Sequence, residues 1–184
     1  MATSVGHALF GITCALCLKR QTSNTTIWHW YVPAVIAANA PDFDFFPGLL
    51  LGNINQFHQG FSHSIIAAII FSLICILFSN WLRNPPLQTA LLGFLAYSSH
   101  LLMDMFANDS RAPFGIPLFW PISNEYLYFP ITLFSGVKHG IPGDSMSVFL
   151  SEVFSIFNFT SVLVETLIVM PILFVALFLS KKRV

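Results

Sequence analysis

The chain has 184 residues, of which 55% are hydrophobic and only 9% are charged, and its net charge is zero. Its mean hydropathy of +0.74 and its twenty phenylalanines exceed what a soluble domain of this length carries, and predict an integral membrane protein. The eight Lys and Arg residues are matched by eight Asp and Glu residues, so no basic patch and no nucleic-acid partner are expected.

Five hydrophobic segments follow one another along the chain. The first two, residues 5–18 and 27–40, are short for a full crossing and are either tilted, re-entrant or set in a thinned bilayer. Residues 64–82, 87–106 and 161–179 each come close to the roughly 20 residues that cross a bilayer as a helix. We therefore predict an all-α, polytopic helical bundle with about five membrane segments.

We treat residues 1–184 as a single membrane-embedded domain. Residues 107–159 contain prolines and aromatic residues that suit the headgroup region, and residues 160–180 form the predicted final membrane helix. Asp144 is expected to cap a helix on the membrane surface. Glu165, inside the last segment, is either a functional proton group or a packed acid.

Basic residues predict the orientation in the membrane. They follow the first, third and fifth segments, as Lys19 and Arg20, Arg83, and residues 181–183. Lys and Arg favour the cytoplasmic side of short connections, and five crossings would bring these clusters to one side. The N-terminus is then outside and the C-terminus inside.

Seven side chains suited to binding metal lie at the ends of these segments: His7, Asp42, Asp44, His58, His63, His100 and Asp104. The predicted topology places all seven on the non-cytoplasmic side, although none of them was used to set the orientation. Structural histidines scattered along the chain would have no reason to fall on one side of the membrane. The sequence therefore predicts a metal site at the non-cytoplasmic rim of the bundle.

The most specific local pattern is His100-Leu-Leu-Met-Asp104, at the end of a predicted helix. A step of four residues returns to within about 40° of its starting direction, so the imidazole and the carboxylate share a face and can bind one ion. A pair hydrogen-bonded without metal fits this pattern alone about equally well. The cost of ionisable groups in a membrane segment favours the functional interpretation.

The second pattern is PDFD at residues 41–44. In an extended chain Asp42 and Asp44 point to opposite sides, so one can bind metal while the other orients a histidine; a bend would bring both in. An aspartate shared between two ions is a further alternative, because its two oxygens can bridge.

The third pattern is HQGFSHS at residues 58–64. His63 is predicted at the start of a helix, with Ser62 as its N-cap. Gly60 permits a bend that would bring His58 near His63, although the two need not bind the same ion.

Neutral imidazole combined with carboxylate suits zinc (Zn²⁺), and also manganese (Mn²⁺), iron or nickel, better than it suits magnesium or calcium. Seven ligands exceed what one open catalytic zinc needs, which indicates two ions. Such a centre lowers the pKa of water and clamps the oxygens of a phosphoester. Hydrolysis is the reaction class that this chemistry implies.

His7, PDFD, HQGFSHS, HLLMD and PFGIPLFWPIS (residues 113–123) occur in this order over roughly residues 1–125. The ordered set resembles the YdjM-like family of membrane-bound metal-dependent hydrolases, which includes LexA-regulated (SOS response) members. The resemblance implies a location in a bacterial inner membrane. The family's second motif reads HRGxTHS, so Gln59 stands where the family has arginine. If that arginine contacts an anionic substrate, the substrate or the rate differs here; if it is structural, little changes.

A more distant similarity is to the zinc-dependent phospholipase C and P1 nuclease group, whose ligands also run His, Asp, His and HxxxD. The group's further HxxxE ligand has no match, because no glutamate follows His139 at that spacing. Asp42 and Asp44 are the expected catalytic carboxylates. Arg111 is the cation best placed to contact a phosphate, with a solvated loop charge as its alternative.

The expected partners are the lipid bilayer and a lipid or phosphoester substrate. Two other functions are consistent with the same residues. A metal transporter would place its ligands along a path near mid-bilayer rather than at one rim. A non-catalytic membrane protein with a structural metal is the other alternative. The sequence does not indicate the oligomeric state.

Overall fold

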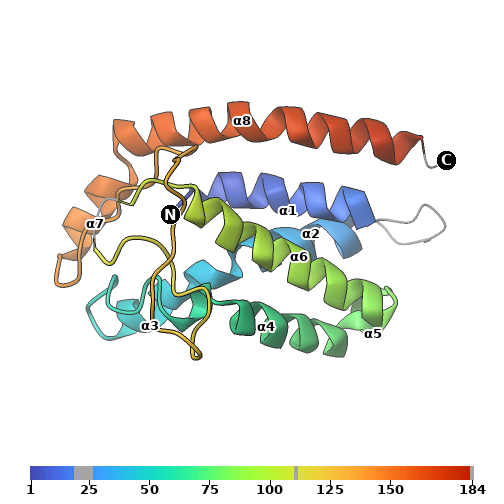
Figure 1. Cartoon of the computed structure of the whole chain (residues 1–184), viewed down its shortest axis with the longest axis horizontal. Coiled ribbons are helices and arrows are strands. Elements are labelled where there is room, and N and C mark those ends of the chain that lie inside the picture. Colours follow the sequence, from blue (N-terminus) through green and yellow to red (C-terminus); the bar gives the residue numbers. More distant parts are fainter. Residues whose placement is uncertain (19–26, 110–111, 183–184) are drawn as a thin grey trace.

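The computed structural model describes residues 1–18, 27–109 and 112–182. Five long helices form its body (Figure 1): α1 (Ser4–Leu18), α2 (Ile27–Asn39), α4 (Ile65–Leu77), α6 (Pro86–Met105) and α8 (Ile156–Lys181). Consecutive long helices run in opposite directions, and α1 and α6 lie at the centre, where α1 contacts α2, α6 and α8. The predicted all-α class is confirmed, since no described residue belongs to a strand longer than an isolated bridge.

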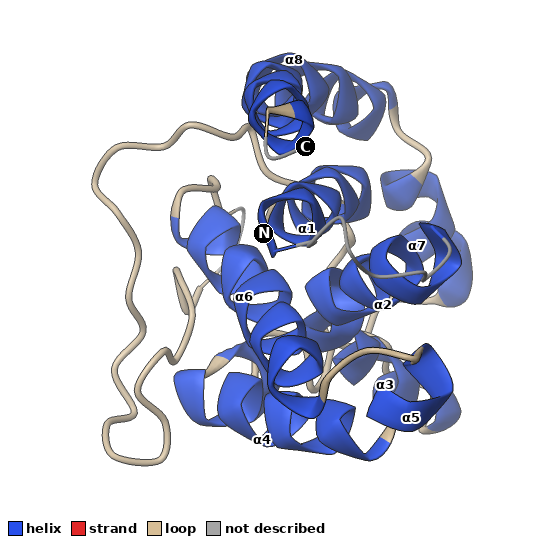
Figure 2. Ribbon diagram, turned by 90° about the vertical axis from the view of Figure 1, so that its right-hand side faces the viewer, coloured by secondary structure: helices blue, strands red, loops and turns tan. Residues whose placement is uncertain are grey.

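Short helices connect the long ones at the two ends of the bundle. They are η1 (Ala40–Asp44), α3 (Phe45–Leu50), η2 (Phe61–His63), α5 (Ser79–Leu82) and α7 (Met146–Val153). The start of α1, the end of α6, η1, η2 and α7 gather at one end, whereas α5 and the C-terminus lie at the other (Figure 1). The segment between α6 and α7 runs as a long loop outside α4 and α6 (Figure 2).

Serine side chains determine where three of the helices begin. In each case Oγ accepts a hydrogen bond from the backbone N–H three residues later: Ser64 for α4, Ser145 for α7 and Ser155 for α8. The predicted caps were therefore wrong at two positions. Ser62 lies inside η2, and Asp144 accepts instead from the backbone N–H of Ile141 at 2.7 Å.

Small residues let the long helices approach closely. Gly11 of α1 lies against α2 so tightly that a Cβ atom there would be 2.6 Å from the carbonyl oxygen of Ala34. Gly93 of α6 meets Cys75 of α4, where a Cβ atom would be 2.7 Å from Sγ. Such contacts are typical of helix packing within membranes, because association there depends on close van der Waals contact.

Helix α8 is the strongest candidate for a membrane span. It has 26 residues, and its most apolar window has a mean hydropathy of 2.7 with only 22% of the residues buried. A helix of this length extends for about 39 Å, which exceeds the roughly 30 Å hydrocarbon core. Because most of its apolar surface faces outward, it is not an internal core helix of a soluble domain.

The other predicted segments are helical but differ in length from α8. Of the described helices, α8 alone is both long and apolar enough to cross a membrane by length and composition, and α1 and α4 are shorter apolar helices of 15 and 13 residues. The predicted segment 64–82 is divided between α4 and α5 at Phe78, and α8 begins before residue 160. The count of five spans stays a prediction.

Candidate metal centre

Four of the predicted ligands meet at the end of the bundle where η1, η2 and the end of α6 gather. We call this the site end. Asp42 comes from η1, His63 from η2, and His100 and Asp104 from consecutive turns of α6. Nε2 of His100 lies 3.2 Å from Nε2 of His63, 3.3 Å from Oδ2 of Asp104 and 3.5 Å from Oδ1 of Asp42. Nε2 of His63 lies 3.5 Å from Oδ2 of Asp104 and 3.6 Å from Oδ1 of Asp42.

These distances match those among the ligands of one metal ion. Ligand atoms that surround an ion tetrahedrally at about 2.0–2.1 Å are separated from each other by roughly 3.3 Å. Nε2 of His63 and Nε2 of His100 lie 3.2 Å apart, and each lies 3.3–3.6 Å from an oxygen of Asp42 and of Asp104, close to this value. We call Asp42, His63, His100 and Asp104 the central quartet.

The two histidines of the central quartet are oriented by hydrogen bonds to their other ring nitrogen. Nδ1 of His100 donates to the carbonyl oxygen of Ala38 at 2.7 Å, which leaves a lone pair on Nε2. Nδ1 of His63 lies 3.0 Å from Oγ of Ser62 and 3.3 Å from Oδ2 of Asp44. Metal-binding histidines are usually held in this way, because the hydrogen bond fixes both the tautomer and the direction of the ring.

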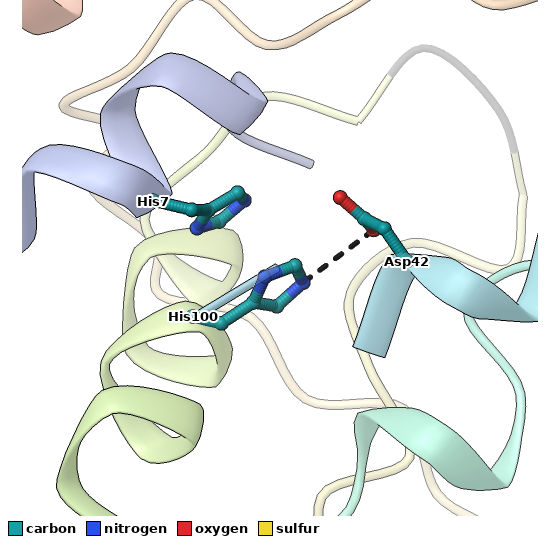
Figure 3. Close-up of side chains that lie close together, drawn as sticks. All are labelled: His7, Asp42 and His100. Atoms are coloured by element: carbon teal, nitrogen blue, oxygen red, sulfur yellow. Dashed lines mark ion pairs between the residues drawn. The ribbon is translucent and has the colours of Figure 1, made fainter. Parts of the chain in front are cut away.

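His7 and His58 flank the central quartet on different sides. The ring of His7 stacks on that of His100 at 3.7 Å, and Asp42 faces His100 from η1 (Figure 3). Nε2 of His7 lies 3.3 Å from Oδ1 of Asp104. His58 approaches from the loop before η2, and its Nε2 is 2.9 Å from Sδ of Met1.

The structure thus contains three overlapping groups that could hold a metal ion. They are His7, Asp42 and His100; Asp42, His58 and His63; and His63, His100 and Asp104. In each group one ligand atom per residue lies within 4.8 Å of the others. Asp42, His63 and His100 each belong to two groups, and of these three only the carboxylate of Asp42 has two oxygens that could bind two ions.

Asp44 has a different environment from Asp42. Its Oδ1 accepts from Nδ1 of His58 at 2.9 Å, and its Oδ2 accepts from Oγ of Ser62 at 2.7 Å and from the backbone N–H of Gln59 at 3.1 Å. It belongs to none of the three groups found among the described residues. Of the two alternatives for PDFD, this geometry favours one ligand, Asp42, and one orienting carboxylate, Asp44.

Burial and opposite charge act against each other in the loop part of the site. Burial would raise the pKa values of Asp42 and Asp44, but the surrounding histidines outweigh it and lower both. Burial lowers the pKa of His58 despite its hydrogen bond to Asp44. Burial also opposes the charge of His63, yet Asp104, Asp42 and Asp44 raise its pKa well above the usual value. The carboxylates therefore strongly stabilise a positive charge placed among them.

Several buried polar atoms of the site have no hydrogen-bond partner within the protein. They are both ring nitrogens of His7, both carboxylate oxygens of Asp42 and Oδ2 of Asp104. Leaving such groups unpaired typically costs 1–3 kcal/mol each, and more when they are charged. A divalent cation would satisfy several of them together, so the donor set fits a metal ion.

The first residues of the chain complete the wall of the site, which the sequence did not predict. The backbone N–H of Ala2 donates to Oδ1 of Asp104 at 2.7 Å, and the amino group of Met1 lies 2.7 Å from Oδ1 of Asp109. His139 also lies beside the site, with its ring 4.9 Å from that of His58. No local sequence pattern could have predicted these contacts, because each of them joins residues that are far apart in the chain.

Gln59 stands where the family has arginine, with a substrate contact or a structural role as the alternatives, and Arg111 was the predicted phosphate contact, with a solvated loop charge as its alternative. Gln59 is buried with a positive φ of 59°, and its Nε2 donates to Oδ1 of Asp109 at 3.2 Å. It therefore faces Asp109 rather than the central quartet, which favours the structural alternative for this position. Arg111 lies outside the described residues, as do Lys19 and Arg20.

Comparisons with known proteins identify relatives of this chain. The Escherichia coli (strain K12) protein named inner membrane protein YdjM is 31% identical over 139 residues, and so is the Shigella flexneri protein of that name; each match covers 65% of either chain. The Escherichia coli inner membrane protein YbcI is 30% identical over 100 residues, which cover 52% of this chain and 56% of the relative. This chain thus spans less than two thirds of the length of these relatives.

No solved structure matches this chain, so the more distant similarity to the phospholipase C group stays a prediction. The relatives' names place them in the inner membrane, in agreement with the composition and with α8. A family profile described as YdjM inner membrane protein matches residues 1–184. The chain therefore belongs to the YdjM family of inner membrane proteins.

Proposed function

We propose that this protein is a membrane-bound hydrolase that uses divalent metal ions, with zinc as the preferred ion, to cleave phosphoesters. The observation that carries the proposal is the buried cluster of imidazole and carboxylate groups, in which unpaired atoms of Asp42, Asp104 and His7 converge. Six side chains offer ligand atoms to three overlapping groups, more than a four-coordinate structural site requires. Two ions with Asp42 between them would use this surplus.

When bound, such ions lower the pKa of a water molecule and neutralise charge on the phosphoryl oxygens. Hydrolysis joins the water oxygen to phosphorus, breaks one P–O ester bond and transfers a proton to the leaving alcohol. Asp42, whose buried oxygens accept no hydrogen bond within the protein, is proposed to help hold the ions that activate this water. Asp44 is proposed to keep His58 and His63 in their orientations.

Charge distribution supports a site on the non-cytoplasmic side. Of the four described basic residues, Arg83, Lys181 and Lys182 lie at the end of the bundle opposite the central quartet, whereas Lys138 lies near it, next to His139. By the preference of Lys and Arg for the cytoplasmic side, that end faces the cytoplasm. The alternating directions of α1, α2, α4, α6 and α8 are consistent with five crossings, of which the shorter ones need a tilted or thinned setting.

A structural metal without catalysis is the second candidate. It is favoured by the burial of the central quartet, since His63, His100 and Asp104 have no exposed side-chain surface. A closed, four-ligand site is typical of structural zinc. The two functions differ in whether phosphoester turnover accompanies the bound metal.

The test compares purified wild-type protein with His100→Ala and Asp104→Ala. We expect wild type to contain metal and to hydrolyse 4-nitrophenyl phosphoesters, and both variants to lose metal together with at least about 100-fold of their activity. His29→Ala, which removes a histidine from the opposite end of α2, is the control and should behave as wild type.

Two outcomes would contradict the proposal in different ways. Unchanged metal content in both variants would reject the metal centre itself. If the variants lose metal but wild type turns over no phosphoester, hydrolysis is rejected and a structural metal is favoured.

A further inference from the structure

A groove beside the metal centre runs between α3 and α7. Its volume is about 310 Å³, and Asp42 is the acidic residue of its lining. The rest of the wall is apolar and includes Phe45, Phe46, Leu49, Ile54, Met146 and Phe149. None of the described lining residues is basic, so the only strong attraction for an anion along the groove would come from the metal centre.

The inner end of the groove is continuous with the candidate ligands. The ring of Phe45 stacks on the imidazole of His58 at 3.9 Å, and Phe149 packs edge-on against Phe45 at 6.1 Å. The side chain of Asp42 is 11% exposed, whereas the side chains of His63, His100 and Asp104 are fully covered. Both carboxylate oxygens of Asp42 are themselves covered, so a molecule that enters along the groove reaches the wall of the metal centre at Asp42.

The outer end of the groove opens onto exposed apolar surface. Phe43, Phe46 and Leu49 line the groove and are themselves 61%, 60% and 44% exposed. The adjacent Leu50 and Leu51 are 71% and 68% exposed. A contiguous apolar surface of this kind marks a contact with another apolar phase, and in a chain with the membrane helix α8 that phase is the lipid at the membrane surface.

We propose that the groove between α3 and α7 binds the hydrocarbon chain of a membrane phospholipid-like ester, with its phosphate placed at Asp42. This inference rests on the proposed function and specifies its substrate class. An apolar wall that leads from the lipid phase to a cation-binding cluster matches an amphiphile with a hydrocarbon chain and an anionic head. A soluble sugar or nucleotide phosphate would leave its hydroxyl and base groups unpaired against the phenylalanines.

Photolabelling tests the groove without requiring turnover. The probe is dodecyl phosphate with a diazirine in its chain, applied to the full-length, metal-loaded protein in phosphatidylcholine nanodiscs. We expect labels on the peptides of α3 and α7, and their suppression by excess dodecyl phosphate but not by dodecyltrimethylammonium, which has the same chain without the anionic head.

Neighbouring leucines of α3 provide matched variants. Leu49 lines the groove, whereas Leu50 is exposed outside it, so Leu49→Gln should reduce α3 and α7 labelling at least about tenfold and Leu50→Gln should not. Both side chains are largely exposed, so neither change should unfold the protein. Equal labelling of the two variants would overturn the groove assignment.

A chain-length series separates this inference from the proposed function. For alkyl 4-nitrophenyl phosphodiesters from methyl to octyl, kcat/KM should rise by up to about fourfold for each methylene that enters the groove. Turnover that is independent of chain length, without headgroup-dependent labelling, would refute the groove while leaving the hydrolase. Specific labelling without turnover of any ester would retain the groove as a lipid site and reject the hydrolase.

Discussion

Asp42 and Asp44 are separated by one residue but have distinct environments. The short 3-10 helix η1 turns them so that Asp42 faces His63 and His100, while Asp44 faces His58 and the N–H of Gln59. The oxygens of Asp42 have no hydrogen-bond partner, and those of Asp44 accept three. The sequence identified both as candidates, but their separate roles depend on the local turn.

This difference predicts separate effects of two matched substitutions. Asp42→Asn should reduce the number of metal ions bound, because it removes a charged ligand shared by two groups. Asp44→Asn should keep the number but weaken zinc affinity by about 10–100-fold, as expected when a partner that orients a histidine is lost. Zinc titration against a competing chelator, with metal analysis of the purified proteins, measures both quantities. Identical losses in the two variants would show that Asp44 is also a ligand.

At the scale of elements, the start of α1 is held in place by α8. Glu165, fully buried on α8, accepts hydrogen bonds from the backbone N–H of Thr3 at 2.8 Å and from its hydroxyl at 2.5 Å. His7 follows one turn later on α1, so this contact positions its ring beside His100 and Asp104. Of the two interpretations of Glu165 from sequence, the structure favours a packed acid with a positioning role.

Removal of this acceptor should loosen the contact between α1 and α8. Glu165→Leu leaves both donors of Thr3 unpaired and should lower the free energy of unfolding by about 1–3 kcal/mol. Glu165→Gln retains an acceptor oxygen and should cost less. Thermal unfolding in detergent ranks the two, and a leucine variant as stable as the glutamine variant would contradict the positioning role.

Across the whole molecule, alternating helix directions bring the metal-binding side chains to one end and three of the four described basic residues, Arg83, Lys181 and Lys182, to the other. The distribution has a direct consequence for membrane topology. If the basic end faces the cytoplasm, then the central quartet and the α3–α7 groove face the opposite side, within reach of lipids of the outer leaflet.

Cysteine labelling can test this topology in a background where Cys14, Cys17 and Cys75 are replaced by serine. Glu125 is exposed in the loop at the site end, and Asn80 is exposed on α5 at the other end. A membrane-impermeant maleimide should label Glu125→Cys in intact spheroplasts and Asn80→Cys only after permeabilisation. The reverse pattern would place the metal centre on the cytoplasmic side.

Composition and short-range spacing were enough to predict the class of the protein and most of the candidate residues. Hydrophobic composition and segment length predict membrane helices, because the cost of exposing apolar residues to water is independent of how helices are paired. The spacing of His100 and Asp104 places them on one helical face for the same local reason. The ordered motifs indicated the family that the full-length match confirms.

Which atoms meet depends instead on the packing of segments that are far apart in the chain. The stacking of His7 on His100, the contact of Ala2 with Asp104 and the anchoring of Thr3 by Glu165 join residues that are distant in the sequence. Their distances depend on how closely whole helices pack, as at Gly11 and Gly93, and no local pattern contains that information. The α3–α7 groove likewise exists because two segments far apart in the chain lie side by side, so its apolar path to Asp42 appears only after folding.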